Sequence, residues 1–196
     1  GLTDRGNIRN LFPLNFDERH RFNATLDYRY GSGSKYNGPR WFGKDIFANA
    51  GVTLIALAVS GRPYTAKIQP TVLGGAGTVG AINGARKPWQ YRLDLRADKD
   101  FDIVSAASGR RPLTLNVYLR VQNLLDTRNI VNVYPATGSA TDDGYLRSPN
   151  GQEALNTIDQ TGRDVNAYID AYSWRLLNPG LYTLPRRIIL GARFGF

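Results

Sequence analysis

Residues 89–98 read WQYRLDLRAD, and this stretch indicates the fold class. Apolar and polar side chains alternate along the whole of it. One face would carry Trp89, Tyr91, Leu93, Leu95 and Ala97, and the other would carry Gln90, Arg92, Asp94, Arg96 and Asp98. Because successive side chains of a β-strand point to opposite faces, this alternation predicts a strand with one apolar face and one charged face.

Three further segments repeat the pattern: RFNATLDYRY at 21–30, LTLNVYLRVQ at 113–122 and RIILGARFGF at 187–196. A fifth segment, 51–60, is apolar on both faces, so its facing is ambiguous, but its length and β-branched residues favour a strand. We therefore predict an all-β, antiparallel fold. The predicted strands lie near 21–31, 50–61, 88–101, 113–124 and 185–196.

The composition of the two faces favours the wall of a transmembrane β-barrel. The apolar faces run unbroken for about five positions, which on a tilted strand covers the ~25 Å lipid band of an outer-membrane barrel. Aromatic residues gather near strand ends, for example Tyr28 with Tyr30 and Phe194 with Phe196, as in interfacial girdles. No stretch approaches the ~18 apolar residues of a membrane helix. A soluble β-sandwich is the alternative, because its strands alternate too.

The connections between the strands alternate in length, as they do in outer-membrane barrels. With the C-terminus in the periplasm, segments 62–87 and 126–184 become extracellular loops, and 1–20 becomes the tail of another. Segments 31–48 and 102–112 become periplasmic turns, of which 31–48 is longer than usual.

The long loop 126–184 is expected to contain helix. Val165, Ile169, Tyr172 and Leu176 recur at spacings of three or four, and Asn178-Pro179-Gly180 supplies a stop signal. A second, shorter helical turn is predicted over 152–158. Structure of this kind is expected in a loop of such length.

Five stretches in order carry a family resemblance: FDERHRFNATLDYRYG (16–31), SGRPYT (60–65), YRLDLRADKDF (91–101), VYLRVQNLLDTRNIVNVYPATG (117–138) and NPGLYTLPRRIILGARFGF (178–196). With them the chain resembles the C-terminal part of TonB-dependent outer-membrane receptors, in particular the Oar-like, Bacteroidota-type branch. The resemblance spans nearly the whole chain.

The resemblance implies a barrel of about 22 strands with an N-terminal plug, of which this chain would supply the last five or so. The sequence contains no Met, so we expect a processed product or a fragment. The implied partners are outer-membrane lipid, the upstream strands and plug, TonB through the missing N-terminal part, the barrel-assembly machinery and a surface lipoprotein.

The last strand resembles the signal read by the barrel-assembly machinery, through Gly191, Phe194 and the C-terminal Phe196. Ile189 departs from that signal, which usually has a polar residue there. An exposed edge with two aromatic residues can template strand addition. Alternatively, both phenylalanines are lipid-facing girdle residues.

The charged faces offer candidate lumen-facing or plug-facing residues. They either guide an anionic ligand, or form cross-strand ion pairs and hold the plug. These residues are Asp27, Arg29, Arg92, Asp94, Arg96, Asp98, Arg120, Arg187 and Arg193.

Aromatic residues in the predicted outer loops are candidate ligand contacts. Their rings could stack on a sugar or grip a peptide, or equally pack the long loop against its own helix. These residues are Tyr64, Tyr134, Tyr145, Tyr172 and Trp174.

No enzyme, cofactor or metal site is predicted. Cys is absent and His20 is the only histidine, which argues against thiolate sites, multi-histidine sites and a Ser-His-Asp triad. Asp142-Asp143-Gly144 lacks the ligand spacing of a calcium loop, and the glycines of 73–85 do not form a phosphate-binding motif. The net charge of +9 is scattered along the chain rather than clustered, which disfavours nucleic-acid binding.

The predicted function is therefore part of an active outer-membrane transporter for an iron chelate, an oligosaccharide or a peptide. An Oar-like barrel with a structural, adhesion or surface-assembly role is the first alternative. A passive porin and a soluble lectin-like sandwich are the others.

Overall fold

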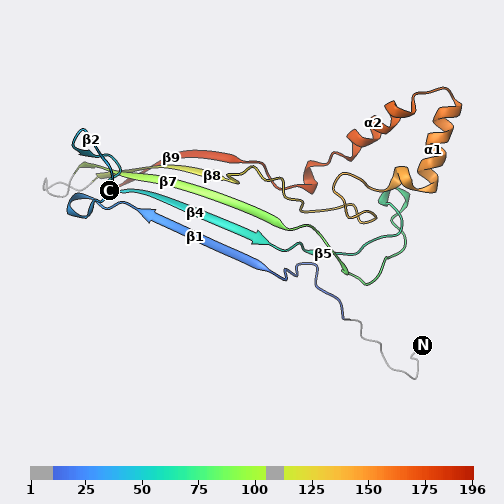
Figure 1. Ribbon diagram of the computed structural model, residues 1–196, viewed down its shortest axis with the longest axis horizontal. Helices are drawn as coiled ribbons and strands as arrows, with labels where there is room; N and C mark the ends of the chain where they lie inside the picture. The colour runs from blue at the N-terminus through green and yellow to red at the C-terminus, as the bar shows by residue number, and fades with distance from the viewer. Residues whose placement is uncertain (1–10, 105–112) are drawn as a thin grey trace, which may run out of the picture. The chain divides into compact units, whose positions relative to one another are not determined.

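The computed structural model describes residues 11–104 and 113–196 (Figure 1). The chain is mostly antiparallel β-sheet with few helices, so the predicted all-β class is confirmed. The loop tail predicted over 1–20 and the turn predicted over 102–112 lie partly outside the described residues.

Five long strands form one sheet in the order β1-β4-β7-β8-β9. They are β1 (Arg21–Arg29), β4 (Ala50–Val59), β7 (Gln90–Val104), β8 (Leu113–Gln122) and β9 (Arg187–Gly195). All five predicted strands are present, each shifted by at most a few residues. Within the described residues the sheet does not close on itself, and β1 and β9 are its outer strands.

The sheet has one apolar and one polar face because the register aligns the alternating residues of neighbouring strands. Leu95 of β7 pairs with Val121 of β8, and Leu119 of β8 pairs with Leu190 of β9. Since partners across a sheet point to the same side, the apolar residues of these three strands share a face.

The facing of β4, ambiguous in the sequence, follows from its neighbours. The backbone N–H of Tyr30 donates to the carbonyl of Ala50 (2.9 Å), which brings the end of β1 beside the start of β4. The hydroxyl of Thr53 donates to Asp27 of β1 (2.6 Å). Thr53 therefore lies on the polar face, and Leu54 lies on the apolar face.

The described residues form two compact units. The sheet unit comprises Arg21–Ala58, Tyr91–Arg128 and Leu184–Phe196. The loop unit comprises residues 11–20 together with Val59–Gln90 and Asn129–Thr183. Nearly all the described residues of the three segments predicted as outer loops thus belong to a single unit.

The loop unit contains the two α-helices, α1 (Pro149–Gln160) and α2 (Val165–Leu176). It also has the antiparallel pair β5 (Pro63–Tyr64) and β6 (Ala85–Arg86), and the 3-10 turns η2 (Thr71–Leu73), η4 (Tyr145–Arg147) and η5 (Pro179–Leu181). Among the described residues, none of the helices has the length and apolar composition needed to traverse a bilayer.

Helix α2 lies where its spacing predicts, and its start is fixed by Asp164. The carboxylate of Asp164 accepts hydrogen bonds from the backbone N–H groups of Asn166 (2.8 Å) and Ala167 (3.3 Å). Helix α1 is longer than the predicted 152–158, because Ser148 caps it and Pro149 occupies its first turn.

Segment 31–48 is more structured than a simple turn. It contains the 3-10 turn η1 (Gly33–Lys35) and a hairpin of β2 (Arg40–Trp41) with β3 (Lys44–Asp45). The two central residues of this hairpin, Phe42 and Gly43, both have positive φ, at 48° and 71°.

Candidate functional site

The polar face of the sheet unit is organised around Asp98 of β7, whose side chain is 5% exposed. Arg29 of β1 donates to both of its carboxylate oxygens at 3.0 Å. Arg96 lies 3.7 Å away on the same strand, and the Asn116 amide of β8 donates at 3.4 Å. A buried carboxylate needs such partners to stay charged.

A glycine makes the Arg29–Asp98 pair possible, since β4 lies between β1 and β7. A Cβ atom at Gly51 would lie 2.7 Å from the Arg29 guanidinium. The arginine therefore crosses β4 over a position without a side chain. One of the two predicted arrangements, cross-strand ion pairing, is present at this point.

The side chain of Tyr118 on β8 likewise lies over a glycine of the neighbouring strand, Gly191 of β9. The Arg96 guanidinium lies 5.2 Å from the centre of the Tyr118 ring, and Tyr118 pairs with Gly191 of β9. A Cβ at Gly191 would lie 2.5 Å from that ring. The glycine of the predicted assembly signal thus accommodates a tyrosine on the polar face.

The other predicted charges divide into paired and unpaired groups. Arg92 lies 3.2 Å from Asp94, which also accepts the backbone N–H of Asn123 at 2.9 Å. Among the described residues, three arginines on the β8–β9 half of the polar face have no ion-pair partner. They are Arg120, Arg187 and Arg193.

The remaining assembly-signal residues are exposed. Phe194 pairs with Leu115 on the apolar face and is 61% exposed, and the terminal Phe196 is 95% exposed. Both are available to lipid or to another protein surface.

In the loop unit, the predicted aromatic residues divide into a cluster and two separate residues. The cluster is Tyr134, Tyr145 and Tyr172, and the two outliers are Tyr64 and Trp174. The rings of Tyr145 and Tyr172 stack at 5.3 Å, and the Tyr134 hydroxyl donates to the carbonyl of Leu176 (3.1 Å). Trp174 is 73% exposed, and Tyr64 contacts the chain at Gly138 instead. The cluster packs α2 against its own loop, which was one of the two predicted roles.

Asp143 anchors this cluster. Its carboxylate accepts the Tyr172 hydroxyl at 2.7 Å and the backbone N–H of Tyr145 at 3.0 Å. A depression of about 260 Å³ opens beside it, lined also by Thr71, Val72, Tyr134, Arg175 and Leu176. That volume lies below the ~300–1,000 Å³ of drug-sized sites, so it suits only a single small group.

Burial governs the ionisation of these phenols. Burial, then the hydrogen bond to Asp143 and its negative charge, raise the pKa of Tyr172 well above its ordinary value. Burial also raises the pKa of Tyr134, with Asp143 again contributing. Both phenols are therefore neutral hydrogen-bond donors at neutral pH.

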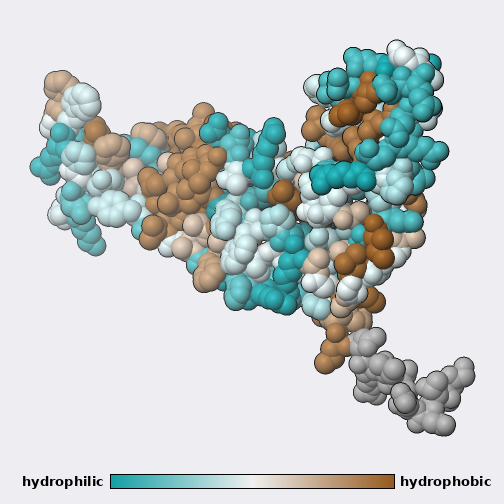
Figure 2. All heavy atoms as spheres, turned by 45° about the vertical axis from the view of Figure 1, so that its right-hand side comes forward, coloured by the Kyte–Doolittle hydropathy of each residue, from teal (hydrophilic) through white to brown (hydrophobic). Residues whose placement is uncertain are grey.

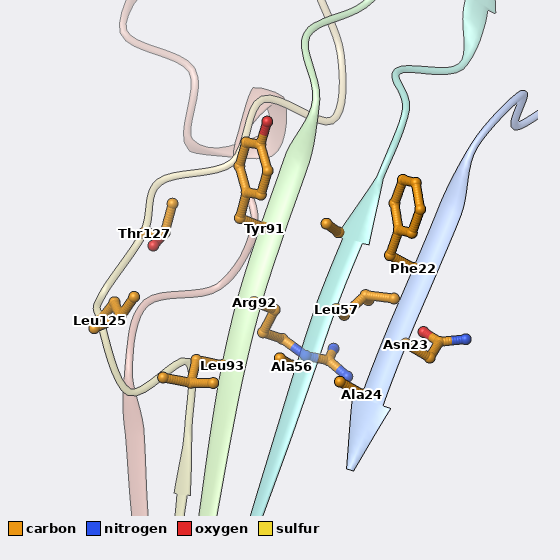
Figure 3. Close-up of a pocket in the computed structure, with 11 residues that line it drawn as sticks. Phe22, Asn23, Ala24, Ala56, Leu57, Tyr91, Arg92, Leu93, Leu125 and Thr127 are labelled. Atoms are coloured by element: carbon orange, nitrogen blue, oxygen red, sulfur yellow. The ribbon is translucent and has the colours of Figure 1, made fainter. Parts of the chain in front are cut away.

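A larger depression of about 460 Å³ lies on the sheet unit (Figure 3). Figure 3 shows Phe22 of β1, Leu57 of β4 and Tyr91 of β7 among its lining residues. Its floor includes the alanines Ala24, Ala56 and Ala58. We interpret it as a hollow left by small side chains in a sheet surface.

No metal site is present in the part of the chain that the structure describes, since no group of three or more His, Cys, Asp or Glu residues is close enough to hold an ion. Asp142 accepts the backbone N–H of Gly144 (2.8 Å) and pairs with Arg147, as in an ordinary turn. The ring of His20 stacks on Trp89 at 6.0 Å.

Sequence reasoning missed two features. The first is Gly51, which leaves room for Arg29 to reach Asp98. That role depends on how β1, β4 and β7 align, which the sequence of one strand does not reveal. The second is the exposed pair Trp41 and Phe42, at 64% and 93% exposure. The unusual length of segment 31–48 was the signal that could have drawn attention to them.

No protein-family model, curated protein or solved structure matches this chain.

Proposed function

We propose that this chain is the C-terminal wall of an outer-membrane β-barrel and serves a TonB-dependent transporter of a large or scarce nutrient. The observation that carries the proposal is the exposed apolar face of the sheet unit. Leu26, Ile188 and Leu190 on the outer strands are 69%, 65% and 74% exposed. Hydrophobic side chains cover part of the surface in Figure 2.

A face of this kind is costly in water and favourable in lipid. Monomeric soluble proteins rarely expose apolar patches beyond a few hundred Å². Within the sheet unit no described helix covers the face. Lipid would cover it, while the ion pairs of the opposite face would border an aqueous or plug-filled lumen.

The open edges of the sheet support a larger barrel. Among the strands that the structure describes, β1 and β9 each have one neighbour, and an unpaired edge exposes backbone N–H and C=O groups. In lipid such groups must be paired. Further strands at both edges would satisfy them, as the resemblance to plugged transporters implies.

The unpaired arginines fit the same proposal. Arg120, Arg187 and Arg193 are exposed cations on the face that would line the lumen. They would contact the carboxylates of a plug or of an anionic cargo.

A substitution pair at adjacent positions of β9 tests the lipid-facing assignment. Leu190→Arg places a charge on the apolar face, and Ile189→Arg places the same charge on the polar face, opposite Arg120. In phospholipid vesicles we expect Leu190→Arg to lower the free energy of unfolding by about 2–4 kcal/mol. Ile189→Arg should cost less than about 1 kcal/mol.

Urea unfolding in vesicles measures both effects. A water-exposed leucine would tolerate the change within about 0.5 kcal/mol. Equal, small effects for both variants would therefore refute the lipid-facing assignment.

A further inference from the structure

The hairpin tip formed by Trp41 and Phe42, here called the aromatic tip, presents two exposed aromatic side chains that contact each other. The side chains are 64% and 93% exposed, and their rings stack with centroids 6.2 Å apart. Stacking on each other leaves the outer faces of both rings in solvent. A tip of this kind has apolar surface that nothing described in the chain covers.

The backbone of the tip is strained by its own sequence. Phe42 has φ 48°, a left-handed conformation that disfavours bulky side chains and favours Gly, Asn or Asp. Gly43 beside it has φ 71° at no such cost. A phenylalanine at this position therefore loses stability that a glycine or asparagine would provide, and such strain tends to mark functional positions.

The base of the tip is fixed by Tyr36, which is 9% exposed. Its hydroxyl donates to the carbonyl of Pro39 at 2.6 Å and accepts the backbone N–H of Phe47 at 3.3 Å. A Cβ at Gly38 would lie 2.7 Å from the Tyr36 ring, so the chain folds tightly over it. The tip is therefore held in place before any partner binds.

The base also continues the apolar face of the sheet. Tyr30, which follows β1 on that face, has its ring 6.0 Å from Tyr36 and 5.8 Å from Phe47. Lys99, on the apolar face of β7, donates to the carbonyl of Ile46. Tyr30 and Lys99, the two residues that contact the base of the tip, both lie on the face assigned to lipid and not on the charged face.

The charges around the tip are mainly positive. The segment carries Lys35, Arg40 and Lys44 against one acid, Asp45, which pairs with Arg40 at 2.9 Å. Among the described residues, Lys35 and Lys44 have no ion-pair partner. Cations beside exposed aromatic rings match the interface of a bilayer that contains anionic lipid.

From these observations we propose that the aromatic tip inserts into the headgroup region of a phospholipid bilayer, with Lys44 and Lys35 contacting anionic headgroups. Trp suits the boundary between acyl chains and water because its large ring has a polar N–H, and Phe adds apolar surface that the acyl chains can cover. This role goes beyond transport, since it fixes the depth of the sheet in the membrane.

Tryptophan fluorescence tests the proposal in the full chain. The double variant Trp89→Phe/Trp174→Phe leaves Trp41 as the only tryptophan. The chain is added to vesicles of phosphatidylcholine and phosphatidylglycerol in equal parts, with acyl chains brominated near the headgroup. We expect blue-shifted Trp41 emission that brominated lipid quenches and aqueous iodide does not.

Two variants on that background separate binding from folding. Phe42→Gly relieves the positive-φ strain, so it should preserve or raise the stability of the fold while weakening tip insertion about tenfold. Lys44→Gln should weaken insertion about fivefold in anionic vesicles and little in pure phosphatidylcholine. Lys67→Gln, the same charge change in the loop unit, is the matched control and should leave insertion unchanged.

The outcomes distinguish this inference from the proposed function. If the chain enters vesicles while Trp41 remains open to iodide, the tip does not bind lipid, and this inference fails while the proposed function stands. If the chain does not associate with either kind of vesicle, both proposals fail.

Discussion

Glycine at position 51 has a role that its own conformation does not explain. Strand interiors disfavour glycine, because it has no side chain to pack and loses more entropy on folding. Here its lack of a Cβ lets Arg29 reach Asp98 across an intervening strand. Glycine lowers the local strand propensity, but the ion pair that it allows between Arg29 and the nearly buried Asp98 offsets this loss.

A valine at this position should therefore destabilise the sheet despite its better strand propensity. Gly51→Val displaces the Arg29 guanidinium and leaves Asp98 with weaker partners, which should cost about 1–3 kcal/mol. Denaturant unfolding in detergent or vesicles measures this loss of unfolding free energy. Ala56→Val on the same strand, which adds volume beside the alanine hollow, is the control and should be neutral or slightly stabilising.

A double-mutant cycle with Arg29→Ala identifies the cause. If Arg29 is already removed, adding Gly51→Val should cost far less than it does alone. A parent-like or higher stability for Gly51→Val would show that the arginine does not need the open position.

At the scale of elements, a buried hydrogen bond from Tyr172 to Asp143 (2.7 Å) joins α2 to its loop, beside the bond from Tyr134 to Leu176. The folded loop unit raises the pKa of this phenol, whereas the unfolded chain keeps it near the ordinary value of about 10. Below pH ~10 the phenol is protonated in both states, and the hydrogen bond contributes fully. Above that pH the phenol ionises first in the unfolded chain, so the stability of the loop unit falls as the pH rises.

We therefore expect the loop unit to lose stability above about pH 10, and Tyr172→Phe to reduce that loss. At neutral pH the variant should be less stable by about 1–2 kcal/mol, because Asp143 loses a donor. Urea midpoints from the helical circular dichroism signal, measured from pH 7 to alkaline pH, follow both effects. An equally steep alkaline decline in the variant would contradict the assignment to Tyr172.

The elements were predictable to the extent that their signals are local. Alternation located four of the five long strands, and the length and β-branched residues of segment 51–60 located β4. The spacing of Val165, Ile169, Tyr172 and Leu176 located α2. The β2–β3 hairpin was missed because its turn places Phe42 where Asn or Gly is usual.

The candidate site was less predictable, because its geometry depends on pairing between strands. The charged residues of β7 were identified as a set. Which of them are buried, and that Arg29 reaches Asp98, depends on contacts between residues 69 positions apart. The aromatic loop residues were likewise identified, but their division into a cluster around Asp143 and two outliers required the fold.

At the scale of the whole molecule, the exposed apolar face and the two open strand edges are expected to control solubility. We expect the purified chain to enter the detergent phase in a cloud-point partition, and to aggregate when detergent is removed. Size-exclusion chromatography after detergent removal provides the second measurement. A stable monomer in the aqueous phase would instead support a soluble sandwich.

The loop unit is built from three stretches that are distant in sequence, and side chains fasten them together. Asn83 donates to the carbonyl of Pro13 (2.8 Å), Arg62 pairs with Glu18 (2.9 Å), and Lys87 donates to the carbonyl of Val131 (2.9 Å).

These contacts between the three stretches affect the order in which the loop unit forms during biogenesis. Contacts between distant stretches form late, because the intervening chain must first be brought together. The contact between Lys87 and Val131 cannot form until the third stretch, which ends at Thr183, has been delivered. We expect the three loops to mature as one late cooperative step, not one hairpin at a time.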